Sequence, residues 1–292
     1  MPHDATPGGP LGEDRLILLG TKGGPRPSLL RSNPANLILS EGSAYLVDCG
    51  YGTTRQLLLA GVQPHELDAI FITHHHSDHT LELGPLLYQA WVGGLRRPID
   101  VFGPPPLATL IDGFFSSLWF EITTRMEDEG RCDPRQLVRI HEVDAASVVL
   151  ETAKIRVTAG QVHHPPLRRA FAYRFDTLHR SLVLSGDTAM CPGLVALARR
   201  ADVLVHEVMR VESLPRLVAG LPNAPALHAH LLASHTTTEQ VGAVAARAEV
   251  GMLVLNHFVP GDDPAITEEM WLASPKRDFE GTVIAGRDLL DV

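Results

Sequence analysis

Short apolar runs rich in Val, Ile and Leu recur along the whole chain and are its strongest structural signal. Runs such as "RLILLG", "AYLVDCG", "SLVLSGD" and "MLVLNH" have the length and the residue types of buried strands. Segments with helical spacing, such as "TTRQLLLAG" and "TTEQVGAVAARA", lie between several of these runs. Because nearly continuous apolar strands belong to sheets covered on both faces, the sequence predicts an α/β sandwich with helices outside two packed sheets.

The length favours a single domain over residues 1–292, because one α/β domain of this size is common. The only linker-like composition is the Gly/Pro-rich start of the chain. Residues 104–150 are the least regular part, since an aromatic helical run there precedes a charged loop. We expect this part to form either a helical lid over a pocket or a helix on the core. Thr236 and Glu239 have the capping-box spacing, which predicts the start of a helix.

The charge balance and the cysteines bear on partners and location. The chain has 34 acidic and 25 basic residues and a formal net charge of −9, which argues against a nucleic-acid or anionic membrane surface. Its three cysteines lie far apart, so neither a disulfide framework nor a thiolate zinc site is indicated. No apolar run reaches the roughly 18 residues of a membrane span, and the start lacks a signal-peptide pattern. We therefore expect a soluble cytoplasmic protein with a small-molecule substrate and no membrane partner; a homodimer is compatible with this sequence.

A histidine-rich motif, "THHHSDH", directly follows the apolar run "LDAIFI". In an extended chain end, alternation places His74 and His76 on the same side, whereas His75 points away and is expected to be structural. Asp78 and His79 follow where the chain turns. Imidazole and carboxylate are ligands that zinc accepts, so the motif predicts a metal site rather than a histidine-rich surface loop.

Three later strand ends carry further candidate ligands. "IRVTAGQV" is followed by His163 and His164, and either histidine could complete a three-imidazole set with the first two. "SLVLSGDT" contains Asp187, which could otherwise be a plain turn residue. "MLVLNHF" contains His257, which could otherwise be a core histidine bonded to the backbone. Residue chemistry alone does not separate His163 from His164.

The pattern H-x-H-x-D-H after an apolar strand resembles the signature of the metallo-β-lactamase superfamily. "LLGTKGGPRP" and "LVDCGYGTTRQLLLAG" are similar to the openings of its ribonuclease Z and arylsulfatase-like branch. The resemblance covers nearly the whole chain, and it implies a four-layer αββα sandwich with one or two metals at the edge of the sheets. The family's motif is similar to the V-x-H-P-P found here, which favours His164 over His163. The implied ligands of two divalent ions are His74, His76 and His164 for one, Asp78, His79 and His257 for the other, and Asp187 for both.

Two further segments resemble motifs of the ribonuclease Z branch. They are "VLVHEVM", which contains Glu207, and "ASHTTTEQ", which contains His235. The resemblance implies that Glu207 orients His235 and that His235 donates a proton to the leaving group, because a carboxylate fixes an imidazole tautomer and raises its basicity. The alternatives are a strand-end ion pair for Glu207 and a residue before a helix cap for His235. Asp78 is also expected to orient the attacking hydroxide, and His228 and His230 could contact the substrate.

A pair of metal ions supports hydrolysis by a metal-bound hydroxide, so a dinuclear metal-dependent hydrolase is the leading expectation. Zinc is the first choice of metal, and manganese or iron also suits these ligands. The resemblance implies a long protruding arm in ribonuclease Z between the positions of His164 and Asp187, and here this interval is short. Together with the acidic charge, this favours a small-molecule ester (an aryl sulfate, a phosphoester or a lactone) over the alternative, a ribonuclease Z-type phosphodiesterase acting on tRNA 3′ ends. A third hypothesis is a metal-binding protein without activity, and the complete ligand set argues against it.

Overall fold

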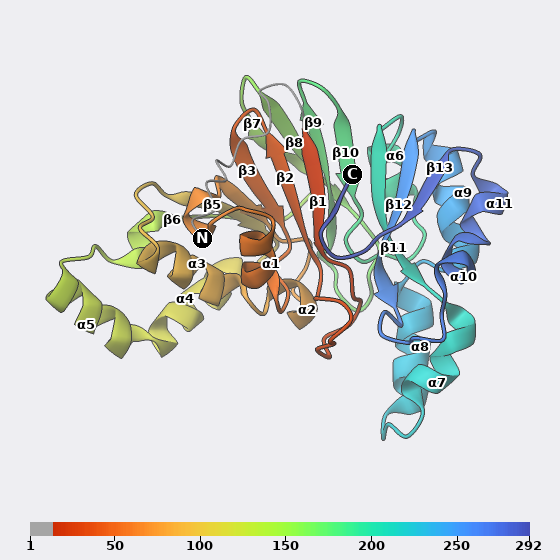
Figure 1. Cartoon of the computed structure of the whole chain (residues 1–292), viewed down its shortest axis with the longest axis horizontal. Helices are drawn as coiled ribbons and strands as arrows, with labels where there is room; N and C mark the ends of the chain where they lie inside the picture. The colour runs from red at the N-terminus through yellow and green to blue at the C-terminus, as the bar shows by residue number, and fades with distance from the viewer. Residues whose placement is uncertain (1–13) are drawn as a thin grey trace, which may run out of the picture.

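The computed structural model describes residues 14–292, so most of the Gly/Pro-rich start lies outside the described residues. Two sheets pack face to face, and helices cover the outer face of each sheet (Figure 1). This arrangement confirms the predicted four-layer αββα sandwich.

Each sheet combines antiparallel and parallel strand pairs. The first sheet has the order β14 (Leu290–Asp291), β1 (Arg15–Gly20), β2 (Ala35–Ser40), β3 (Ser43–Val47), β4 (Ala69–Phe71), β5 (Ile99–Gly103), β6 (Val138–Glu142). The second sheet has the order β13 (Thr282–Ala285), β12 (Met252–Val259), β11 (Val203–Met209), β10 (Ser181–Leu184), β9 (Phe171–Thr177), β8 (Ile155–Gln161), β7 (Ser147–Glu151). Strands β3 to β6 pair in parallel in the first sheet, and strands β10 to β13 do so in the second.

Helices pack on the outside of both sheets because the outer face of each sheet is apolar as well as the inner one. The core of the first sheet takes side chains from α1 (Thr53–Leu59), α3 (Leu83–Val92), α4 (Leu107–Ser117) and α5 (Trp119–Glu129). The core of the second sheet takes side chains from α6 (Pro192–Leu197), α9 (Thr238–Ala248) and α10 (Glu268–Leu272), and α11 (Pro275–Asp278) packs beside α9. Helices α7 (Leu214–Val218) and α8 (Ala224–Ser234) extend away from the sheets at the lower right of Figure 1. The short helix α2 (Ser77–Thr80) and the 3₁₀ turns η1 (Pro64–Glu66), η2 (Pro134–Leu137) and η3 (Val211–Ser213) complete the set.

Aromatic side chains fill the space between the two sheets. Phe71 of β4 stacks on Phe102 of β5 with ring centroids 5.0 Å apart. Its edges meet two rings of the opposite sheet, at 5.1 Å from Phe175 and 5.4 Å from Tyr173. Such contacts add to the area burial of large apolar rings. Phe71 therefore ties the strand before the histidine-rich motif to the second sheet.

The structure differs from the sequence expectation at two places. Strands β6 and β7 lie inside the region expected to be least regular; their side chains are largely exposed, so no continuous apolar run marks them. The capping box at the start of α9 is made by Thr237 and Gln240, one residue beyond the predicted pair. The predicted cap was wrong because the Thr236 hydroxyl donates to the carbonyl of Thr188 instead.

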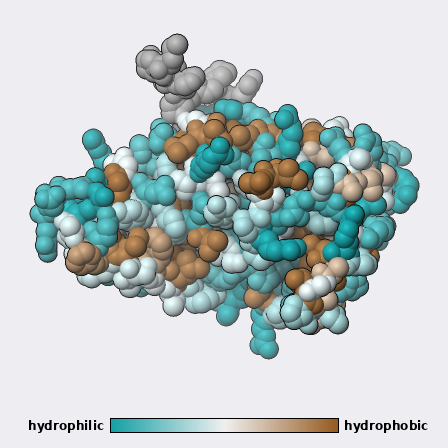
Figure 2. Space-filling view, turned by 60° about the horizontal axis from the view of Figure 1, so that its bottom comes forward, coloured by the Kyte–Doolittle hydropathy of each residue, from teal (hydrophilic) through white to brown (hydrophobic). Residues whose placement is uncertain are grey.

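The region 104–150 contributes to the core of the first sheet. Leu107, Ile111 and Phe115 of α4 are buried there. Helix α5 projects further out at the left of Figure 1 and carries Phe120, which is 87% exposed. In Figure 2 the bottom of Figure 1 is turned toward the viewer. Apolar residues on this face lie in separate patches among hydrophilic ones. None of the described helices is long and apolar enough to cross a membrane.

Candidate metal centre

The predicted ligand residues come together at one edge of the sandwich. The histidine-rich motif follows β4 and leads into α2, His164 follows β8, Asp187 follows β10, and His257 lies in β12. The carboxyl ends of parallel strands are the usual ligand-binding edge of α/β sheets. Three groups of possible metal ligands have their ligand atoms within 4.8 Å of one another. The groups are His74, His76, His164 and Asp187; Asp78, His79 and His257; and Asp187, His235 and His257.

In the first group, three imidazole nitrogens face one another. His76 Nδ1 lies 3.1 Å from His74 Nε2 and 3.0 Å from His164 Nε2. Asp187 Oδ2 lies 3.8 Å from the first of these Nε2 atoms and 3.9 Å from the second. Nitrogens bound to one tetrahedral ion at about 2.0–2.1 Å lie about 3.3 Å apart, so this spacing fits a shared metal ion.

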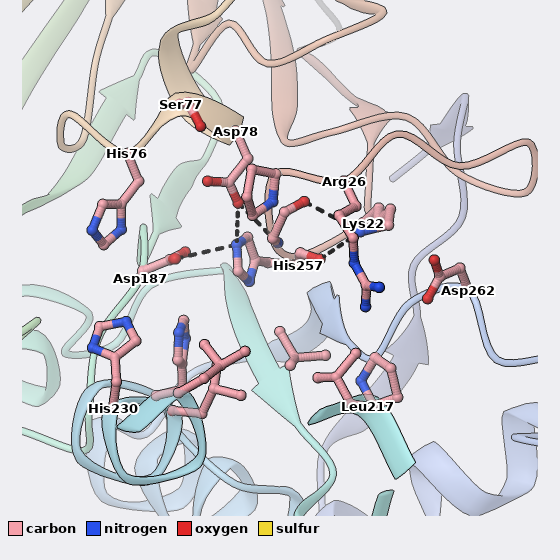
Figure 3. A pocket seen from close by; sticks show the side chains of 18 of the residues that line it. Lys22, Arg26, His76, Ser77, Asp78, Asp187, Leu217, His230, His257 and Asp262 are labelled. Carbon is pink, nitrogen blue, oxygen red and sulfur yellow. Dashed lines mark hydrogen bonds and ion pairs between the residues drawn. The ribbon is translucent and has the colours of Figure 1, made fainter. Parts of the chain in front are cut away.

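In the second group, Asp187 again lies within reach. His257 Nε2 lies 3.4 Å from Asp78 Oδ2 and 3.2 Å from Asp187 Oδ2 (Figure 3). His79 Nε2 lies 3.7 Å from Asp78 Oδ2 and 3.3 Å from Asp187 Oδ1. The Asp187 carboxylate thus lies between the two groups, and the whole cluster is consistent with a dinuclear metal site.

A β-bulge directs His257 into the cluster. Asn256 of β12 pairs with Glu207 of β11, and Phe258 pairs with the next residue, so His257 is an extra residue on its strand. Its φ of 45° is in the left-handed region. Bulges of this kind re-aim side chains next to active sites. Gly23 leaves room for the ring, because a Cβ at that position would lie 2.8 Å from it.

Backbone and carboxylate groups hold the ring nitrogens that face away from the cluster. His79 Nδ1 donates to Asp48 Oδ2 at 2.8 Å, and Asp48 Oδ1 also accepts from the backbone N–H of Thr73 at 2.8 Å. His164 Nδ1 donates to the carbonyl of Ser234 at 2.9 Å. Such partners fix the tautomer and the orientation of metal-binding histidines. The sequence analysis did not identify Asp48, although the carboxylate at the end of the apolar run "AYLV" is a signal of the same kind as Asp187.

The pKa values of three ligands suit metal binding, whereas His79 would have to lose a proton to a metal ion. Burial would lower the pKa of His79, but the carboxylates of Asp187 and Asp48 outweigh it and raise the pKa well above its usual range. Burial holds the pKa of His74 well below its usual range and lowers the pKa of His164 to about 4, so both imidazoles are neutral at pH 7. Burial would raise the pKa of Asp78, but the neighbouring His79 and His257 outweigh it, and the pKa falls to about 2. Neutral imidazole and ionised carboxylate are the forms that bind metals.

Several polar atoms of the cluster are buried without a hydrogen-bond partner among the described residues. They are His79 Nε2, Asp187 Oδ1 and both ring nitrogens of His257. A buried polar atom without a partner is costly, and native structures hold few of them. Metal ions at the centre of the cluster would satisfy His79 Nε2, Asp187 Oδ1 and His257 Nε2, so the residues present fit a dinuclear site. His257 Nδ1 lies on the side of Gly23 instead.

Glu207 and His235 form a buried pair beside the cluster. Both carboxylate oxygens of Glu207 lie 3.0 Å from His235 Nδ1, and Glu207 also accepts from the backbone N–H of Thr188 at 2.7 Å. Burial by itself would lower the pKa of His235, but the Glu207 carboxylate outweighs it and the pKa rises to about 9. The imidazole is therefore protonated at neutral pH, with its Nε2 available to donate a proton.

Three histidines that are neighbours of site residues in the sequence lie outside the cluster. His163 is exposed, whereas its neighbour His164 is fully buried. His75 Nε2 donates to the carbonyl of Pro104 at 2.6 Å. His206 is buried in β11, and its Nδ1 lies 2.8 Å from the carbonyl of Glu207.

A cavity of about 420 Å³ opens beside the cluster, and Figure 3 shows the side chains around it. Its lining consists of residues 22–26, 76–78, 187, 217, 221, 223, 227, 230, 231, 235, 257, 259, 260 and 262. All residues of the region 104–150 are described, and none of them lines this cavity. The cavity gives a substrate access to Asp78, Asp187 and His235 from one side.

The family comparison agrees with this fold and site. Residues 44–258 match the model of the β-lactamase superfamily domain. Solved structures with the same fold include the metallo-β-lactamase fold protein YhfI from Bacillus subtilis, with a TM-score of 0.70, 18% identity, and 96% and 98% of the two chains covered. A second is the short form of human tRNase Z, with a TM-score of 0.68, 22% identity, and 95% and 98% covered. The fold and the site are those of a metal-dependent hydrolase.

The similarity to curated relatives shows to which family of metal-dependent hydrolases the chain belongs. A protein named Ribonuclease Z from Mycolicibacterium gilvum (strain PYR-GCK) is 32% identical over 277 residues, which cover 94% of each chain. Another protein of this name, from Mycobacterium avium (strain 104), is 34% identical, and the alignment covers 94% of this chain and 96% of the relative. The chain therefore belongs to the β-lactamase superfamily and, within it, to the ribonuclease Z family.

These relatives correct the substrate expected from the sequence. The prediction of a small-molecule ester, with nucleic acid unlikely, was wrong, and the comparisons do not support the arylsulfatase-like part of the resemblance. The short interval between His164 and Asp187 does not exclude this family, because proteins named Ribonuclease Z align with this chain along nearly their whole length. The argument from charge fails because the net charge averages over the whole surface and does not describe the site.

Proposed function

We propose that this protein is a ribonuclease Z-type endonuclease that cleaves a phosphodiester bond at the 3′ end of precursor tRNA. The observation that carries the proposal is the alignment with proteins named Ribonuclease Z over 94% of this chain. The site supports the same chemistry, since a cluster of metal-binding side chains lies next to a buried Glu207–His235 pair.

The ligand assignment is part of the proposal. Bound metal ions would lower the pKa of a water molecule and offset the negative charge of the phosphate. We propose zinc, because it accepts imidazole and carboxylate together, and manganese or iron would suit the same donors. The ligands are His74, His76 and His164 for one ion, Asp78, His79 and His257 for the other, and Asp187 for both.

Two side chains would handle protons during cleavage. Asp78 Oδ2 accepts from the backbone N–H of Gly24 at 2.8 Å, which holds the carboxylate at the cavity, where it would orient the attacking water. His235 would donate the proton on Nε2 to the leaving oxygen, while Glu207 holds Nδ1. General acid catalysis of this kind contributes about 10²- to 10⁴-fold to a rate.

We also propose one domain over the whole chain and a cytoplasmic location. The location rests on the cysteines: all three are free, and Cys49 is buried in the core of the first sheet. Free cysteines are typical of reducing compartments.

Cleavage of a precursor tRNA with a 3′ trailer tests the proposed function. The protein loaded with zinc or manganese is expected to release the trailer, and mature tRNA of the same sequence is expected to stay intact. The Asp187→Ala variant is the matched control for a contaminating nuclease. Loaded wild-type protein that leaves the precursor uncut would contradict the proposal.

A further inference from the structure

One wall of the cavity beside the metal cluster is apolar and plays no part in holding the metals. It consists of Leu217 of α7, which is labelled in Figure 3, Leu221 of the turn, and Leu227 and Leu231 of α8. We call these four residues the leucine wall.

The leucine wall is held in place by a small core of its own. Leu231 is buried in a cluster with Met209 of β11 and Val259 of β12, and Leu217 and Leu227 pack against this cluster. A wall packed in this way offers a preformed apolar surface. Apolar lining with a few polar groups is typical of sites that bind organic ligands.

His230 is the polar group at the end of the leucine wall nearest the metal cluster. It lies on α8, and its ring centroid is 6.2 Å from that of His76 and 6.3 Å from that of His235. The proposed proton donor and His230 thus line the same cavity. A group bound on the leucine wall would lie next to the oxygen that His235 protonates.

The contacts of His230 make its Nε2 a hydrogen-bond acceptor. Its Nδ1 lies 3.1 Å from Ser234 Oγ, and that hydroxyl donates at 2.7 Å to the carbonyl of Pro165 or of His230 itself. We assign the hydroxyl proton to one of these carbonyls, because donation to the ring would leave both carbonyls without it. With this assignment Nδ1 carries the ring proton, and Nε2 is the acceptor nitrogen of a residue that lines the cavity. Burial, and then the neighbouring His235, lower the pKa of His230 and so favour the neutral ring.

The charges around the cavity indicate that the leucine wall is not a phosphate-binding site. The wall itself has no cation, whereas Lys22 and Arg26 lie on the other side of His257 from His230 (Figure 3). Phosphates bind to Lys and Arg, and an acceptor nitrogen disfavours them. An uncharged group with an apolar face and a hydrogen-bond donor at its edge fits the leucine wall and His230 better than a phosphate does. A nucleoside has both, in its base and its ribose hydroxyl.

We propose that the leucine wall and His230 form a nucleoside subsite, which binds the nucleoside whose oxygen leaves during cleavage. The inference rests on the proposed function. The base packs on the leucines without regard to its identity, and a ribose hydroxyl donates to His230 Nε2. A contact to the 2′-hydroxyl lets a protein distinguish RNA from DNA at one position.

Precursor tRNAs altered at a single nucleotide test the leucine wall. Analysis of the product ends identifies the nucleotide that keeps the hydroxyl after cleavage. Removing the base of that nucleotide is expected to lower kcat/KM of the wild type about tenfold, since an apolar contact of this size discriminates at least that strongly. Leu227→Ser is expected to lower kcat/KM about tenfold on the intact precursor but to cause no further loss on the abasic one. The control is Leu232→Ser, which changes an exposed leucine of α8 outside the cavity and is expected to have no effect.

A 2′-deoxy sugar at the same nucleotide tests His230. The wild type is expected to cleave this substrate more slowly than the all-ribose one, and His230→Phe is expected to cleave both at one rate with its metal content unchanged. Normal cleavage of the abasic and deoxy substrates by the wild type would overturn the subsite and leave the proposed function standing. A wild type that cuts no precursor would overturn both.

Discussion

His235 Nδ1 lies 3.0 Å from both carboxylate oxygens of Glu207, although 28 residues separate the two in the chain. Glu207 is 2% exposed and His235 is 6% exposed, so water screens their attraction little. The carboxylate therefore both orients the ring of His235 and keeps it protonated. The other ring nitrogen is left to donate toward the cavity.

Replacing His235 is expected to affect substrates according to their leaving groups. His235→Ala should retain metal and fold, yet lose about 10²- to 10⁴-fold in the rate of precursor cleavage, where the leaving ribose oxygen needs a proton. Bis(p-nitrophenyl) phosphate, whose leaving group needs little protonation, should be cleaved almost as fast as by the wild type. Glu207→Gln should show the same pattern more weakly. Equal losses on both substrates would assign His235 to substrate binding instead.

The pH profile should report the proton on His235. Its pKa is raised to about 9, above the ordinary value of 6.5, so the donor is present below pH 9 and is lost as the pH rises through that value. The kcat/KM of precursor cleavage should therefore fall above about pH 9. Glu207→Gln removes the charge that stabilises the imidazolium, so the falling limb should move to lower pH. If kcat/KM of Glu207→Gln falls at the same pH as that of the wild type, the titrating group is not His235.

Metal content tests the ligand assignment directly. Wild-type protein is expected to hold two metal ions per chain, because two groups of donors meet at Asp187. Asp187→Ala should lose metal and slow every substrate alike, whereas His163→Ala should keep both ions because His163 is exposed outside the cluster. Elemental analysis after dialysis measures both. Wild-type protein that takes up no zinc or manganese would contradict the assignment.

Asp48 is expected to act on the metals through His79. Asp48→Asn keeps the size of the side chain but loses the charged partner of His79 Nδ1, which lies 2.8 Å away. Loss of such a partner costs about 10- to 100-fold in metal affinity. Competition with a chromogenic chelator measures this change. Asp133→Asn is the control: it changes a half-buried carboxylate that is paired with Arg135 outside the cluster, and it should bind metal normally.

The aromatic contacts between the sheets should dominate stability. Phe71→Ala removes a fully buried ring that contacts Phe102, Tyr173 and Phe175, and is expected to lower the free energy of unfolding by about 3–5 kcal/mol. Phe120→Ala removes an exposed ring of the same size and should change it by less than about 0.5 kcal/mol. Urea denaturation followed by circular dichroism measures both variants. Equal effects would contradict the described packing.

The sequence by itself predicted the layers of the fold, because strand and helix patterns depend on neighbouring residues. The apolar runs that lead to the motif and to Asp187 are strands β4 and β10, and "TTEQVGAVAARA" contains helix α9. Strands β6 and β7 were missed because their exposed side chains leave no apolar run. The cap of α9 was misplaced by one residue because Thr236 is occupied by Thr188, 48 residues away.

The tertiary structure alone decided how the site is assembled, because its contacts join residues far apart in the chain. It placed His164 inside the cluster and His163 outside, which residue chemistry could not do. It brought Asp48 to His79, and it turned His257 inward at a bulge that depends on pairing between β11 and β12. Local sequence motifs show which metal-binding side chains are available. Their distances, burial and protonation arise only when distant strands pack side by side.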